Sequence, residues 1–100
     1  MALELCNSYF ESSWSESLEK NNDFDTLMNW VSAEFILYQQ EDQQGIKVYF
    51  PNGWFVIRTI EEMDNEYLVH IWSKSKFNFS TIKEQLSLAL HRFKQIKKRY

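Results

Sequence analysis

Few residues of this chain belong to the types that carry catalytic or metal chemistry, and they are widely separated. The histidines are His70 and His91, and Cys6 is remote from both. A zinc site needs three or four such ligands, and a nucleophilic cysteine needs a basic partner. We therefore expect no metal, no cofactor and no enzymatic activity, and each histidine taken alone is expected to be structural or solvent-facing.

Four acidic residues crowd one short stretch: Glu61, Glu62, Asp64 and Glu66. They lack the alternating ligands and the glycine of a calcium loop, so we interpret the stretch as a solvated acidic connection. Gly45 and Gly53 are isolated, and no glycine-rich phosphate loop is present.

A set of aromatic and basic residues gives the strongest functional signal. Strand alternation over residues 46–73 predicts one face carrying Lys47, Tyr49, Trp54, Val56, Arg58, Leu68, His70 and Trp72. Trp, Tyr and Arg are enriched at binding hot spots, because each combines a large contact area with a directional polar group. The predicted partner-binding residues are Tyr49, Trp54, Arg58, His70 and Trp72, with Glu61, Glu62, Asp64 and Glu66 as a charged rim.

The opposite face of the same strands is apolar throughout. It carries Ile46, Val48, Phe50, Phe55, Ile57, Tyr67, Val69 and Ile71. A stripe of Ile82, Leu86, Ala89, Leu90 and Phe93 predicts a long C-terminal helix that packs on this face. Thr81 and Glu84 form a candidate capping box, so Ser80 or Thr81 is the expected N-cap.

Three strands are expected over residues 46–50, 54–60 and 67–73. The turn between the first two is marked by Pro51-Asn52-Gly53, and the acidic stretch 61–66 connects the next pair. Connections this short require antiparallel neighbours.

The N-terminal half is predicted to begin with two helices. Leu5, Tyr9, Trp14 and Leu18 recur at spacings of four to five and indicate a helix over 4–20. A second helix begins at Phe24 and ends near Val31 or Ser32. Residues 33–38 are apolar on every helical face, which favours a strand from Ala33 to Gln39 before the polar loop 40–45. A helix continuing through Gln39 is the alternative, and the sheet would then have three strands.

These elements predict one α+β domain over residues 1–100. It has an antiparallel meander of three to four strands, a long C-terminal helix that packs on it, and one or two N-terminal helices. Either the N-terminal helices cover the aromatic face, as in a three-layer domain, or that face stays exposed.

Length, composition and charge narrow the functional classes. The chain has 100 residues, of which 44% are hydrophobic and 17% aromatic, which excludes a disordered protein. The first 50 residues carry a net charge of −7 and the last 50 carry +4, for a total of −3. The basic end, with Arg92, Lys94, Lys97, Lys98 and Arg99, either complements the helix dipole or binds a partner.

The features that the chain lacks indicate its compartment, and its composition indicates the class of partner. It has one cysteine, no apolar run of membrane-spanning length and no secretory signal in its first fourteen residues, so we expect a cytoplasmic protein. The composition favours a small acidic protein-binding module. We expect an inhibitor of the immunity, antitoxin or anti-defence type that occludes a basic toxin or a nucleic-acid-binding protein. The alternative is nucleic-acid binding through the basic C-terminal helix and the aromatic face.

Overall fold

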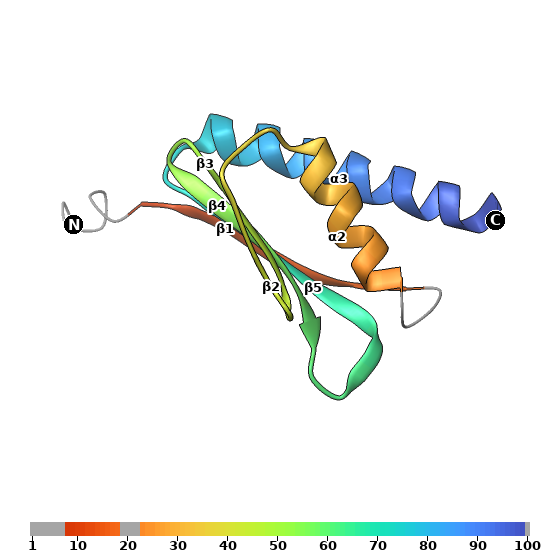
Figure 1. The fold of residues 1–100 in the computed structure, drawn as a ribbon. Coiled ribbons are helices and arrows are strands. Elements are labelled where there is room, and N and C mark those ends of the chain that lie inside the picture. Colours follow the sequence, from red (N-terminus) through yellow and green to blue (C-terminus); the bar gives the residue numbers. More distant parts are fainter. Residues whose placement is uncertain (1–7, 19–22, 100) are drawn as a thin grey trace.

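The protein forms a two-layer arrangement of one sheet and two helices (Figure 1). The computed structural model describes residues 8–18 and 23–99, apart from the side chains of residues 64 and 97–99. The elements in chain order are β1 (Phe10–Ser17), α2 (Asp23–Glu34), β2 (Gln39–Asp42), β3 (Gly45–Phe50), β4 (Gly53–Ile60), β5 (Met63–Ser73) and α3 (Lys76–Arg99).

The sheet has the strand order β1-β5-β4-β3-β2, and every neighbouring pair is antiparallel. Both helices lie on the same side of it (Figure 1). The expected α+β class, antiparallel sheet and long C-terminal helix are confirmed. The sheet has five strands instead of three to four, and α2 is the single helix described before β2.

The predicted helix over residues 4–20 is wrong, because residues 10–17 form β1. The helix prediction rests on Leu5, Tyr9, Trp14 and Leu18, but Tyr9 lies on the open face and Trp14 on the helix side, as a step of five along an extended chain requires. The step of four from Trp14 to Leu18 suits a strand as well as a helix. The residues between them decide, since half-buried and exposed side chains alternate one by one along β1. Residues 4–7, 19 and 20 of the predicted helix lie outside the described residues.

The predicted strand over residues 33–39 is also wrong. The helix α2 continues to Glu34, and the Phe35 N–H still donates to the Val31 carbonyl (3.3 Å). The Gln39 side chain then donates to the Ser32 and Phe35 carbonyls (3.1 and 2.6 Å), which satisfies the free end of the helix. The fourth meander strand exists, but it begins at Gln39.

The hydrophobic core lies between the sheet and the two helices. The predicted apolar face of the strands is buried throughout, and Leu86, Leu90 and Phe93 of α3 pack against it with Leu27 and Val31 of α2. The two helices also contact each other, because the Trp30 indole N–H donates to the Ala89 carbonyl (2.9 Å).

Two ends of elements differ from the prediction. The N-cap of α3 is Ser75, whose hydroxyl accepts the Asn78 N–H (3.2 Å), so the helix begins one turn before Thr81 and the Thr81–Glu84 box does not cap it. The acidic connection shrinks to a tight turn at Glu61 and Glu62, with φ of 75° at Glu62.

The buried position of Leu90 generates a test of this packing. The substitution Leu90→Ala is expected to lower the free energy of unfolding by ~2–5 kcal/mol, the range for a large-to-small change in a core. Denaturant melts measure it. The matched control is Leu88→Ala on the same helix, where the side chain is 48% exposed and the loss is expected to be small. Equal losses at both positions would contradict the packing of α3.

Candidate functional site

An aromatic band crosses the sheet on the face opposite the helices. Tyr49, Trp54 and Trp72 are direct cross-strand neighbours on β3, β4 and β5. Tyr38 extends this row beyond Tyr49, and Tyr9 extends it beyond Trp72. We call the five residues Tyr38, Tyr49, Trp54, Trp72 and Tyr9 the aromatic band. Ring centroids are 5.5 Å apart for Tyr38 and Tyr49, 6.0 Å for Trp54 and Trp72, and 5.9 Å for Trp72 and Tyr9.

Lys47 fills the remaining gap in the band. Its ammonium nitrogen lies 5.1 Å from the Tyr49 ring centroid and 4.7 Å from that of Trp54, within the range of a cation–π interaction. Trp54 therefore has Lys47 of β3 on one side and the nearly parallel Trp72 ring of β5 on the other, at an interplanar angle of 15°. The Trp54 ring is therefore already in contact with a cation and with a second indole in the free protein.

His70 joins the band to β1. Its ring meets Trp54 edge-on at 5.1 Å between centroids, and its Nε2 lies 2.5 Å from the Glu11 carboxylate. His70 and Glu11 are both part-exposed and come from neighbouring strands of the sheet. The contact links the two strands across the open face.

Of the predicted site residues, the structure brings together Tyr49, Trp54, His70 and Trp72. Arg58 is exposed on the same face, but it lies four residues along β4 from Trp54, which corresponds to roughly 13 Å. It lines a polar hollow with Asp42 and Lys47, and this hollow adjoins the band at Lys47.

The predicted acidic rim is spread along one hairpin. Glu61 and Glu62 are exposed in the β4–β5 turn, and Glu66 is half-buried in β5 opposite Ser17 of β1. The backbone of Asp64 lies in β5, while its side chain lies outside the described set. The rim is therefore beyond Arg58 and far from the two tryptophans.

Three residues of this face were not predicted to lie on it: Tyr9, Glu11 and Tyr38. Lys47 was predicted on the face, but its contact with the aromatic rings was not. Tyr9 and Glu11 were assigned to a helix, and Tyr38 to the end of a strand over residues 33–39. The signal that could have located Glu11 is the one-by-one alternation of β1, which places it on the same face as Trp72.

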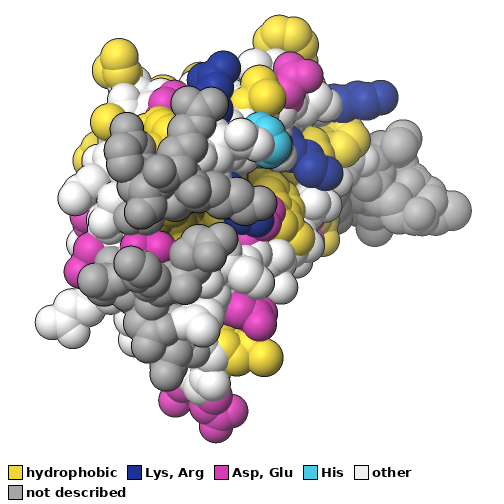
Figure 2. All heavy atoms as spheres, turned by 90° about the vertical axis from the view of Figure 1, so that its right-hand side faces the viewer, with side chains coloured by type: hydrophobic (Ala, Val, Ile, Leu, Met, Phe, Trp, Pro, Cys, Tyr) yellow, Lys and Arg dark blue, Asp and Glu magenta, His cyan; other side chains and the backbone are white. Residues whose placement is uncertain are grey.

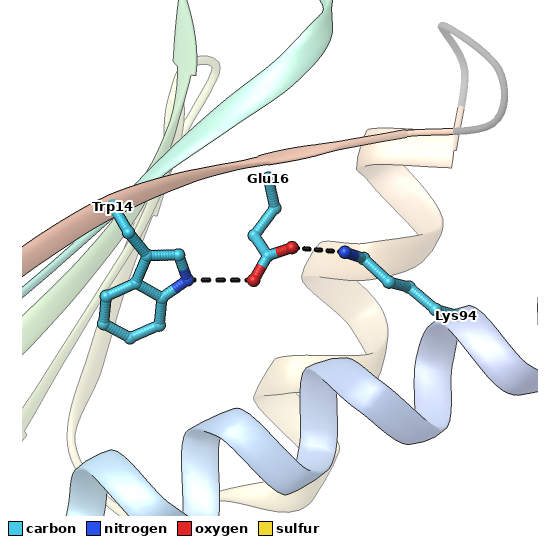
Figure 3. A network of polar contacts seen from close by, with 3 residues as sticks. All are labelled: Trp14, Glu16 and Lys94. Atoms are coloured by element: carbon cyan, nitrogen blue, oxygen red, sulfur yellow. Dashed lines mark hydrogen bonds and ion pairs between the residues drawn. The ribbon is translucent and has the colours of Figure 1, made fainter.

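A second polar cluster lies on the helix side, between β1 and α3 (Figure 3). The Glu16 carboxylate accepts the Trp14 indole N–H (2.9 Å) and binds the Lys94 ammonium. Tyr67 is 1% exposed, and its hydroxyl has no hydrogen-bond partner within the described part of the chain. Burial, and secondarily the Glu16 charge, raises the pKa of Tyr67 well above its ordinary value. The Glu16–Lys94 ion pair ties β1 to α3.

Neither a metal centre nor a membrane span emerges from the described residues. Among residues 8–18 and 23–99, no three or more His, Cys, Asp and Glu side chains gather closely enough to hold a metal ion. No helix in that part of the chain is long and apolar enough to cross a membrane. No protein-family model and no curated protein matches the chain, so its function is inferred from geometry.

The Tyr67 environment predicts a specific alkaline instability. A pKa raised in the folded state stabilises the protein below the ordinary pKa of about 10, and this contribution is lost as the pH rises beyond it. Between pH 9 and pH 11, the wild type is expected to lose about 1.4 kcal/mol more stability than Tyr67→Phe does. Denaturant melts at the two pH values measure this difference. Equal losses would mean that Tyr67 ionises as easily in the folded chain as in the unfolded one.

Proposed function

We propose that this protein is a non-enzymatic binding module that uses its open sheet face to occlude a partner protein. The observation that carries the proposal is the aromatic band on a face that no described helix covers. Large aromatic side chains that remain half-exposed at the centre of a face are typical of binding hot spots. The band lies on the three central strands β3, β4 and β5, and at each end it continues onto a residue that directly precedes an edge strand.

The order already present in the band favours a protein partner over nucleic acid. Single-stranded nucleic acids bind by stacking bases on free aromatic faces. Trp54 already packs against Lys47 and Trp72, so its ring is less available for stacking with a base than an isolated indole would be. A rigid, packed band instead lowers the conformational entropy that the protein loses on binding, which is the advantage of preorganised interfaces.

The distribution of charge supports a basic partner. Viewed from the end of the molecule, Lys and Arg side chains gather in the upper part, at the height of α3, and most acidic side chains lie below them (Figure 2). The lower part holds the β4–β5 hairpin, whose turn is formed by Glu61 and Glu62. These carboxylates lie beyond Arg58 and not beside the tryptophans, so they act at long range: the negative potential at this end of the molecule steers the approach of positively charged proteins. We extend the proposal to an inhibitor of the immunity, antitoxin or anti-defence type that acts in the cytoplasm on a basic toxin or nucleic-acid-binding protein.

The first test measures how the band contributes to affinity. After affinity capture from the native host identifies a partner, Trp72→Ala is expected to weaken binding by ~2 kcal/mol or more, about 30-fold, mainly through faster dissociation. Surface plasmon resonance gives the two rate constants. The matched control is Leu88→Ala on the opposite side of the molecule, which is expected to leave both unchanged. If Trp72→Ala keeps its circular dichroism spectrum and full affinity, the band is not the hot spot.

A second test separates steering from contact. Reversal of charge at Glu61 and Glu62 is expected to slow association and to flatten its dependence on salt, with little change in the dissociation rate. Mobility-shift assays with single-stranded RNA and DNA at two salt concentrations test the alternative. Tight, salt-dependent binding of nucleic acid that Trp72→Ala abolishes would replace the protein-partner proposal.

A further inference from the structure

The two free edges of the sheet differ in how they are protected. At one edge, β2 has four residues and carries Glu41 and Asp42. At the other, β1 has eight residues that pair with β5 without a bulge. Natural edges avoid association through short strands, lysine, proline, bulges or exposed charges. β1 has no lysine or proline, and its two carboxylates, Glu11 and Glu16, are bound to His70 and Lys94 of its own chain.

A single hydrogen bond identifies which backbone groups of β1 point away from the sheet. The Leu18 N–H donates to the Asn65 carbonyl (2.6 Å), and these two residues continue the β1–β5 register. Backbone groups alternate in direction along a strand, so Trp14 and the other even-numbered residues bind β5. The residues whose N–H and C=O point away from the sheet are Glu11, Ser13, Ser15 and Ser17. Within the described residues, β1 is the outermost strand on this side.

The sequence of β1 is nearly symmetric about Trp14. Ser13 and Ser15 flank it, and Phe10 and Leu18 lie four positions away on either side. An antiparallel second copy with its twofold axis at Trp14 pairs Phe10 with Leu18, Glu11 with Ser17, Ser12 with Glu16, and Ser13 with Ser15. No two like charges are opposed. Registers shifted by two residues would place Glu16 opposite Phe10 or opposite Trp14.

From this near-symmetry and the unprotected edge, we infer that two copies of the chain pair through β1 into a continuous ten-stranded antiparallel sheet. The register centred on Trp14 uses all four outward N–H groups and all four outward carbonyls of each copy. The inference stands apart from the proposed function, because it concerns the edge of the sheet and not its aromatic face.

The position of α3 enlarges the contact. The helix follows β1, since Phe79 near its start contacts Phe10 (ring centroids 6.0 Å apart) and Lys94 near its end binds Glu16. The twofold axis therefore places the two α3 helices side by side and antiparallel. Ser87 and His91 line a hollow between α3 and Glu16 on this side of the helix.

Proline at an outward position tests the pairing. Ser15→Pro removes an N–H that does not bind β5, so the monomer is expected to keep its fold. By analytical ultracentrifugation, the wild type is expected at twice the chain mass of 12.1 kDa and Ser15→Pro at the single mass, with unchanged circular dichroism. The control is Glu41→Pro, an outward position on the β2 edge, which is expected to remain dimeric. A monomeric wild type at millimolar concentration, or a dimeric Ser15→Pro, overturns the inference.

Disulfide cross-linking tests the register, and it keeps the inference falsifiable if Ser15→Pro fails to fold. In a Cys6→Ser background, Ser13→Cys and Ser15→Cys are expected to form a covalent dimer when mixed and oxidised. Neither variant alone is expected to cross-link well, because equivalent residues lie too far apart along the strands for a disulfide. Efficient cross-linking by either variant alone would place the axis at that residue, and no cross-link from the mixture would exclude the pairing.

Discussion

The antiparallel pairing of β1 with β5 determines most of the structure. It places the first described strand beside the last one and gives Glu66, which has no partner in the β4 register, a partner in Ser17. It brings Glu11 to His70 on one face and Glu16 to Lys94 on the other. Since residues 10–17 are used as a strand, they are not available as a helix to cover the aromatic face.

The aromatic side chains of the open face pack against one another, which reduces the apolar area that they expose to water. Tyr49, Trp54 and Trp72 contact one another or Lys47, so part of their apolar area is removed from water without a covering layer. Aromatic pairs with centroids 4.5–7 Å apart contribute about 0.5–1.5 kcal/mol beyond area burial. The same residues that would bind a partner therefore also stabilise the free protein.

Local patterns predicted the C-terminal two thirds of the fold well. The alternation of β3, β4 and β5 gave both faces of the sheet, and the α3 stripe gave its packing, because each signal is complete within one element. The errors occurred where one spacing of apolar residues fits both a helix and a strand, or where a side chain farther along the sequence determines the end of an element. The spacing of Trp14 and Leu18 fits both a helix and a strand, and the α2 terminus depends on the Gln39 side chain. The predicted face carries Trp54, His70 and Trp72 as neighbours, whereas Arg58 lies farther along β4, because alternation specifies a face and not a distance along it.

The same strand pairing also sets the order in which the protein can fold. Roughly 50 residues separate Ser17 from its partner Glu66, so closing β1 onto β5 carries a large loop entropy. The β3–β4–β5 meander and α3 are joined by short turns and can form first. On the ribosome, β1 emerges before any of its partners exist. Because this closure carries the largest loop entropy of the strand pairings, we expect the N-terminal strand to dock last.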